Sequence, residues 1–294
     1  MLGQGDYTVG PTGYNLGEYS VIADPEFTEL DQAFVQYKKD KLTVKLGRQV
    51  IALDGQRFVG HVGWRQDRQT FDAATVIYAV NEKLKVQYSY LNQRNRIFGE
   101  AADLDSKDHL FNLNYKTHSG VFTAYSYLLE VDNATNNALD TYGISFKGKT
   151  TAADTDDSTF VYAVEYATQS SESGNTDFTA DYLFAEIGVN ISSLTAKIAY
   201  EVLGSDGGNY AFATPLATLH KFNGWSDQFL GTPSQGLVDV IFTLSGKVGG
   251  GNWIAAYHDF SADKPTQNVD DLGAEINLQY TRLFATHYTA AIKY

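Results

Sequence analysis

The chain has 294 residues, no cysteine, 35 acidic against 22 basic side chains, and a formal net charge of −13. The absence of cysteine excludes disulfides, thiolate metal sites and a cysteine nucleophile. The acidic balance argues against nucleic-acid binding as the main role, because phosphate contacts need a basic face. Twenty tyrosines, 17 phenylalanines and 26 glycines favour many short strands and turns.

Apolar and polar residues alternate along most of the chain with the period of two that predicts β-strands. We expect fourteen strands, at residues 29–38, 42–49, 70–80, 84–92, 109–117, 121–129, 141–147, 159–168, 181–191, 194–202, 237–244, 253–260, 272–280 and 287–294. The alternation is clearest in the fourth, where Val86 and Tyr88 flank the polar Gln87. Each strand carries one apolar row, so the expected fold is all-β.

The expected connections alternate in length. They are short after the first, third, fifth, ninth and thirteenth strands, and mostly long and polar after the even-numbered ones, such as 169–180 after the eighth. Residues 148–158 and the glycine run at 247–252 are looser links. Outer-membrane barrels have short periplasmic turns and long outer loops, whereas a soluble sandwich has no reason to gather its long loops at one end. We predict a transmembrane antiparallel up-and-down β-barrel, forming a single domain over residues 1–294.

The polar rows support the same fold. They are rich in Gln, Asn, Ser and Thr, which suits a water-filled lumen. Aromatic residues at strand ends fit girdles at the lipid interfaces; examples are Tyr37, Tyr90, Tyr115, Trp253 and Tyr280. The alternative is a soluble β-sandwich or binding module, whose apolar rows converge inside. The residues that separate these folds, by facing outward in one band or inward, are Val86, Tyr88, Ile198 and Ile276.

The long connection at residues 50–69 and its flanks gather arginine in an acidic chain. The basic residues here are Arg48, Arg57, Arg65 and Arg68. A loop that folds into a barrel narrows the channel, and basic side chains on it raise the local concentration of anions. The alternative is that the arginines are structural and form salt bridges within the loop region. The carboxylates for such pairs are Asp54, Asp67 and Asp72. Both roles can hold together.

A second long connection, residues 203–236, carries many apolar residues at roughly helical spacing. An exposed loop would not present so many apolar groups. We expect it to fold back as a short helix or plug against the barrel wall. Trp225 within it is a candidate for an aromatic contact with a solute.

Catalytic and metal-binding patterns are absent from the sequence. The six histidines are scattered without metal-ligand spacing. The acidic run Asp154, Asp156 and Asp157 lacks the glycine and closing glutamate of a calcium loop. No GxSxG, P-loop or dinucleotide fingerprint occurs. We expect no enzyme, no metal and no cofactor.

Three stretches carry a specific resemblance: "LGRQVIALDGQRFVGHVGWRQDRQTFDA" at 46–73, "NRIFG" at 95–99 and "TPLATLHKFNGWSDQFLGTPSQGLVD" at 214–239. The chain resembles the bacterial alginate-export family of outer-membrane porins. The resemblance implies a monomeric eighteen-stranded barrel in the outer membrane, surrounded by lipid, with an arginine-rich pore for an anionic uronate polymer. The residues that it marks as the anion-binding constriction are Arg48, Arg57, Arg65 and Arg68, with Lys45 and Arg94 as weaker members.

The resemblance and the strand count together imply a fragment. Residues 1–26 show no strand or signal-peptide pattern, and the chain ends inside a strand pattern, so three strands would precede it and one would follow. The predicted function is a passive outer-membrane channel for anionic saccharides or other small anions, with a weakly selective diffusion porin as the alternative. One departure is that the polar rows carry many carboxylates; they are Glu165, Glu186, Glu201, Asp239 and Glu275.

Overall fold

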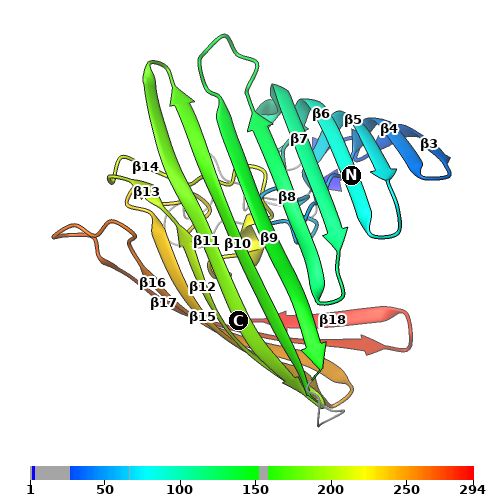
Figure 1. The fold of residues 1–294 in the computed structure, drawn as a ribbon. Coiled ribbons are helices and arrows are strands. Elements are labelled where there is room, and N and C mark those ends of the chain that lie inside the picture. Colours follow the sequence, from blue (N-terminus) through cyan, green and yellow to red (C-terminus); the bar gives the residue numbers. More distant parts are fainter. Residues whose placement is uncertain (1, 4–26, 66, 152–157) are drawn as a thin grey trace.

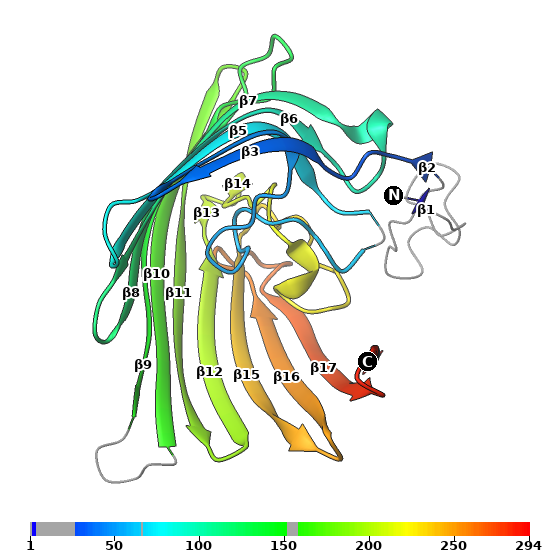
Figure 2. The ribbon, with the colours of Figure 1, turned by 90° about the vertical axis from the view of Figure 1, so that its right-hand side faces the viewer.

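The structure is a computed structural model that describes residues 2–3, 27–65, 67–151 and 158–294. Fourteen strands form one antiparallel sheet in which every neighbour in space is the next sheet strand in sequence. They are β3 (Ala33–Lys39), β4 (Leu42–Gln49), β5 (Thr70–Ala79), β6 (Leu84–Asn95), β7 (Leu104–Lys116), β8 (Gly120–Leu129), β9 (Leu139–Thr151), β10 (Ser158–Ser173), β11 (Thr176–Ile191), β12 (Leu194–Leu203), β15 (Leu237–Val248), β16 (Gly251–Ser261), β17 (Asp271–Phe284) and β18 (Tyr288–Lys293). The sheet curves strongly about its inner face (Figures 1 and 2).

The remaining elements are small. Two-residue strands pair as β1 (Leu2–Gly3) with β2 (Phe27–Thr28), and as β13 (Ser205–Asp206) with β14 (Tyr210–Ala211). Among the described residues there are two single-turn 3-10 helices, η1 (Glu100–Ala102) and η2 (Leu219–Lys221). Within the described ranges, no helix is long and apolar enough to cross a membrane.

The apolar rows face outward. Val35, Ile187 and Ile276 expose 75%, 65% and 58% of their surface, and they belong to outward rows in β3, β11 and β17. A soluble protein does not leave so large a continuous apolar surface in water. The strand registers place Val86, Tyr88, Ile198 and Ile276 on this outer surface. The prediction of a membrane barrel wall is therefore confirmed, and the convergence expected of a sandwich is not found.

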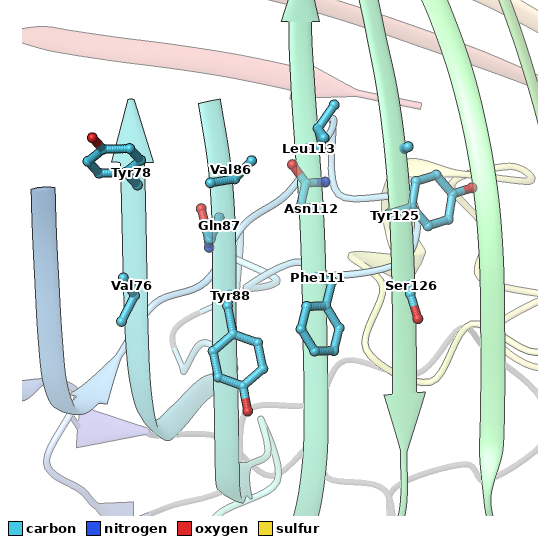
Figure 3. Close-up of a pocket in the computed structure, with 11 residues that line it drawn as sticks. Val76, Tyr78, Val86, Gln87, Tyr88, Phe111, Asn112, Leu113, Tyr125 and Ser126 are labelled. Atoms are coloured by element: carbon cyan, nitrogen blue, oxygen red, sulfur yellow. The ribbon is translucent and has the colours of Figure 1, made fainter. Parts of the chain in front are cut away.

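Figure 3 shows part of this outer surface, where apolar side chains of β5, β6 and β7 stand in rows. Small residues on β8, Ala124 and Ser126, leave an apolar hollow of about 490 Å³ beside Phe111 and Leu113. The inward residues of the same strands, such as Asn112, alternate with them. In a bilayer the hollow faces lipid chains.

Aromatic residues mark the end of the sheet where the tight turns lie. Tyr78 and Tyr115 end their strands on the outer face, and both are more than one-third exposed. The hydroxyls of Tyr162 and Tyr280 donate hydrogen bonds to carbonyls of the neighbouring turns, at 2.6 and 3.1 Å. An amphipathic ring at the edge of an apolar band is typical of a membrane interface.

The turns follow the expected alternation with one exception. Gly249 and Gly250 form a two-residue turn between β15 and β16, with φ angles of 55° and 77° that favour glycine. The expected long connection at 169–180 is wrong. Residues there extend β10 and β11, which pair from Ser158–Ile191 up to Ser173–Thr176 and turn through Gly174. Thr, Ser and Phe residues continue the alternation, so the hairpin extends the sheet instead of forming a loop (Figure 1).

Two long connections fold into the curve of the sheet (Figure 2). We call them the first inner loop (residues 50–69) and the second inner loop (residues 204–236). The buried core lies between these loops and the inward side chains at the long-loop end of the wall. Its largest members include Phe58, Phe71, Leu91, Leu110, Tyr127, Tyr182, Phe212, Leu216 and Leu237. Phe212, Leu216 and Ala217 of the second inner loop are buried here, whereas Leu230 stays 39% exposed. The short helix in this loop is the single turn of η2.

Several expectations from the sequence fall on residues that the structure does not describe. They are most of the segment 1–26, which was expected to hold no strand, and the acidic run Asp154, Asp156 and Asp157. Within that segment the expectation is wrong at Leu2–Gly3, which pair with β2 as β1.

Candidate functional site

The two inner loops form one unit through backbone and side-chain hydrogen bonds. Val59 and Leu216 form a parallel bridge, and the Gly60 N–H donates to the Leu216 carbonyl at 2.8 Å. The side chain of Gln69 donates from Nε2 to the Gly60 and Leu216 carbonyls, at 2.9 and 3.1 Å. Thr218 Oγ1 donates to Gln56 Oε1 at 2.7 Å. The loops therefore hold each other in place inside the sheet.

Arg57 attaches this unit to the wall. Its Nε lies 2.7 Å from Glu201 Oε1 on β12, and its second nitrogen donates to Asn223 Oδ1 at 3.1 Å. The guanidinium carbon lies 4.8 Å from the centroid of the Phe222 ring and 5.6 Å from that of Tyr182. The residue is only 5% exposed. A buried, paired guanidinium of this kind fixes a loop, and its charge is compensated locally.

The other loop arginines are also paired. Arg65 lies 3.2 Å from Asp227 in the second inner loop. Arg68 donates from Nε to Asp31 Oδ1 at 2.7 Å. The carboxylates are not the ones expected from the sequence, because the loops fold against distant segments and not onto themselves.

The two flanking arginines lie on the wall near its long-loop end. Arg48 shares the outward alternation row of Leu46 and pairs with Asp72 at 2.8 Å and Glu29 at 3.1 Å. Arg94 is buried and forms a two-pronged pair with Asp108 at 2.7 and 2.8 Å. Both guanidinium groups are held by carboxylates, whose two oxygens can accept a pair of parallel N–H bonds from an arginine.

Of the predicted carboxylate partners, only Asp72 pairs with a predicted arginine, Arg48. Asp54 instead accepts hydrogen bonds from the amides of Asn112 and Asn114 on the wall. Asp67 is 4% exposed, and its Oδ2 has no partner within the described part of the chain. Burial, followed by repulsion from Glu29, raises the pKa of Asp67 to about 6.

The wall carboxylates that seemed to oppose an anion pathway are mostly enclosed by donors. Glu201 accepts from Arg57, the Tyr182 hydroxyl at 2.7 Å and Asn223 Nδ2 at 2.8 Å. Asp239 pairs with His258, and Glu275 accepts the Trp225 N–H at 2.5 Å and the Ser226 N–H at 2.9 Å. Glu165 receives the Tyr125 hydroxyl at 3.0 Å and Lys147 at 2.9 Å. Glu186 pairs with Lys197 at 3.0 Å.

Lysines remain accessible on the inner wall toward the tight-turn end. Lys85 and Lys116 are exposed, and in the described ranges no carboxylate lies within 4.0 Å of either ammonium. They line a cavity of about 500 Å³ together with Lys83, Lys147, Asp54 and the exposed turn residue Glu82. We call Lys85, Lys116 and Lys147 the lysine wall. Lys147 is paired with Glu165 but still 41% exposed at its side chain.

Two further cations extend the basic surface. Lys221 of η2 donates from Nζ to the Gly55 carbonyl at 2.9 Å. Burial, followed by repulsion from Lys147, lowers the pKa of Lys221, so it lies near the lysine wall. Lys45 of β4 faces inward, with its Nζ 3.6 Å from the Phe34 ring centroid.

Sequence reasoning missed the lysine wall and the two-loop unit. Each lysine occupies a single polar position near the end of its strand, which the apolar–polar alternation of any strand would explain. Only the pairing register of β6 to β9 brings them to the same region of the wall. Trp225 was singled out, but its neighbours Trp64 and Lys293 come from two other parts of the chain, and only His220 shares its loop. Within the described ranges, no three His, Asp or Glu side chains converge to hold a metal ion.

A curved antiparallel sheet with an apolar outer face, a polar inner face and loops folded inside defines a β-barrel channel protein of the outer membrane. The sequence matches the family described as Alginate export over residues 18–216, which is more than half of the chain. The chain belongs to this family. No curated protein matches the sequence.

Solved structures with the same fold come from the Occ and Opd porins. OccAB4 of Acinetobacter baumannii is 12% identical with a TM-score of 0.67, and the match covers 86% of this chain and 65% of that one. OpdL of Pseudomonas aeruginosa is 12% identical with a TM-score of 0.66, covering 89% and 76%. OccD3 (OpdP) of the same organism is 13% identical with a TM-score of 0.65, covering 92% and 74%.

The chain therefore spans less than two thirds of OccAB4 and about three quarters of the other two. At these identities the similarity establishes the fold. Family and fold together place the chain in the bacterial outer membrane, in contact with its lipid, and among channels rather than enzymes.

Proposed function

We propose that the protein is a passive channel that favours anionic solutes, with sugar acids as the substrate class, and that it acts as a monomeric barrel. The observation that carries the proposal is the difference in accessibility between the two signs of charge. The wall carboxylates are enclosed by donors, whereas Lys85 and Lys116 are exposed and lack carboxylate partners among the described residues.

The accessible charges of the lumen determine the electrostatic potential that acts on a passing ion. Cations lining a narrow aqueous path with low-dielectric walls raise the local concentration of anions. A buried ion pair contributes little to this field because its charges compensate each other at short distance. The lumen can therefore favour anions although the chain as a whole carries a formal charge of −13.

In this proposal the predicted constriction residues have a positioning role. Arg57, Arg65 and Arg68 hold the inner loops that narrow the lumen, and Arg48 and Arg94 secure the wall beside them. Lys45 belongs with the lysine wall as an inward cation. The family name supports an acidic saccharide as the solute.

The test is the reversal potential of the full-length protein in a planar bilayer under a KCl gradient. We expect the sign that reports chloride preference, decreasing at high salt as screening grows. Liposome swelling would then be faster with glucuronate than with glucosamine, which has the same ring and the opposite charge. A reversal potential of the opposite sign would overturn the proposal.

A weakly selective diffusion porin is the second candidate. The pairing of all five predicted arginines with carboxylates favours it, because those charges contribute little net field. A reversal potential near zero and equal swelling rates for the two sugars would identify this function.

A further inference from the structure

A second recess lies apart from the lysine wall, where both inner loops meet β17 and β18. Its volume is about 910 Å³. Its functional side chains are Trp64 from the first inner loop, His220 and Trp225 from the second, and Lys293 from β18. We call these four residues the aromatic recess. Two of the three tryptophans in the chain thus meet at one site, although 161 positions separate them in the sequence.

Trp64 and His220 form a stacked pair. Their ring centroids are 3.8 Å apart and their planes differ by 15°. His220 Nδ1 lies 2.8 Å from Asp227 Oδ1, and its Nε2 lies 2.9 Å from Lys293 Nζ. An ammonium can only donate, so Nε2 accepts and the ring proton resides on Nδ1, donated to Asp227. His220 is therefore a neutral imidazole that orients Lys293, and Trp64 stays 49% exposed despite this stack.

Lys293 is the cation of the recess. Its Nζ lies 4.2 Å from the Trp225 ring centroid and 5.0 Å from that of Trp64. No carboxylate lies within 4.0 Å of it among residues 27–65, 67–151 and 158–294. Its neighbours are two π faces and an imidazole nitrogen, and the carboxylate of Asp227, more than 4.0 Å away, compensates part of its charge. A carboxylate entering the recess would find an oriented donor whose charge is only partly compensated.

Trp225 is held in place by the wall. Its backbone N–H donates to Glu275 Oε1 at 2.5 Å and to Asn277 Oδ1 at 3.2 Å. The following residue, Ser226, donates its N–H to the same carboxylate oxygen at 2.9 Å. Glu275 therefore fixes the backbone of the loop at Trp225. Because the indole is already held in position, ligand binding does not incur the entropy cost of ordering it.

We propose that the aromatic recess is a binding subsite for the ring-borne carboxylate of a sugar acid. The carboxylate pairs with Lys293, and the apolar C–H surface of the ring packs against the indoles of Trp64 and Trp225. Large aromatic surfaces with a few placed polar groups are typical of a small-molecule site. The other charged residues of the lining are Arg65, Asp227 and Glu275, of which Arg65 pairs with Asp227 and Glu275 accepts the backbone N–H groups of the loop. This inference rests on the proposed function, because the recess would be a binding site for the solute within an anion-favouring channel.

The experiment uses the full-length protein with Trp253→Phe as the background. Trp253 lies on the outward row of β16, so its removal leaves the fluorescence of Trp64 and Trp225 as the only tryptophan signal. Titration with glucuronate is expected to quench this signal saturably. Glucose, which lacks the carboxylate, and acetate, which lacks the ring, should each bind at least tenfold more weakly.

Variants separate charge from structure. Lys293→Gln should weaken glucuronate binding about tenfold, whereas Lys293→Arg keeps the charge and should retain most of the binding. The matched control is Lys107→Gln, which removes an exposed rim lysine paired with Asp132 and should change nothing. Isothermal calorimetry on Trp64→Ala in the same background gives a second reading, with an expected loss of about tenfold.

Three results would overturn the subsite: equal quenching by acetate or by glucose, unchanged glucuronate binding in both Lys293→Gln and Trp64→Ala, or no saturable quenching at all. The reversal potential measured on the same preparation separates this failure from that of the proposed function. Chloride preference with no glucuronate site removes only the subsite, whereas cation preference removes the proposed function as well.

Discussion

Arg57 in the first inner loop and Glu201 on β12 form a buried ion pair, with Nε and Oε1 2.7 Å apart although 144 residues separate them in the chain. Glu201 also accepts from Tyr182 and Asn223, so one carboxylate joins the wall and both inner loops. This pair explains why an acidic chain carries arginines in a long connection: each arginine meets a carboxylate brought in by another segment.

Removing one partner of this pair should destabilise the protein without changing its ion preference. Arg57→Gln leaves Glu201 charged and buried, at an expected cost of about 3 kcal/mol. Urea unfolding from detergent micelles measures this cost. The double variant Arg57→Gln with Glu201→Gln removes the uncompensated charge and should recover most of the loss. A single variant as stable as the wild type would contradict the role of Arg57 in fixing the loop.

The outward row should tolerate charge much less than the inward row of the same strand. On β15, Phe242 faces outward and is 48% exposed, whereas Thr243 faces inward opposite Lys197. Phe242→Glu should lower the free energy of unfolding in lipid vesicles by about 2 kcal/mol. Thr243→Glu, its matched control, should lie within about 0.5 kcal/mol of the wild type. Equal effects at the two positions would contradict the assignment of the faces.

Asp67 predicts a pH-dependent difference between the wild type and Asp67→Asn. Its pKa is raised to about 6 by burial and by repulsion from Glu29, Asp31 and Asp103, against one backbone donor from Arg68. The folded state therefore holds the proton more tightly than the unfolded chain, whose value is 3.8. The wild type loses stability relative to the variant as the pH rises from about 4 to about 6, and the difference is constant above that.

The full difference corresponds to about 3 kcal/mol at 1.36 kcal/mol per pKa unit. Urea unfolding of both proteins at pH 4.5 and 7.5 measures about two thirds of it, because the unfolded chain has begun to ionise below pH 4.5. The variant should gain on the wild type between these two values. If the stability of the variant relative to the wild type decreased as the pH rises, the folded state would stabilise the Asp67 carboxylate. That result would contradict the expected effect of burial.

The strands could be predicted from the sequence because their signal is local. Alternation such as Val86–Gln87–Tyr88 encodes both the strand and its two faces, and all fourteen sheet strands lie where this pattern occurs. The β10–β11 hairpin was predicted too short, because its upper part holds mainly Ser, Thr, Glu and Asp, with Phe178 as its large apolar residue. A strand that is polar on both faces has the same composition as a loop, so the sequence alone does not distinguish the two.

The charges of the candidate site could not be assigned in the same way. A sequence shows that Arg57 and Glu201 exist, but only the fold of two loops separated by more than a hundred residues brings them together. The same holds for Lys85 and Lys116, because the β6–β7 register pairs Lys85 with Asn114, two residues before Lys116. Whether a cation is paired or accessible depends on the tertiary structure. The sequence therefore pointed to the clustered arginines as the site and not to the isolated lysines.

The most direct test of the account compares two sets of variants in the planar-bilayer reversal-potential measurement. Lys85→Gln with Lys116→Gln removes accessible charge, whereas Arg57→Gln with Arg68→Gln removes charge that is already paired. We predict chloride preference in the wild type, a marked shift toward potassium in the lysine variant, and little change in the arginine variant. A shift confined to the arginine variant would contradict the account and place the selective charge on the first inner loop.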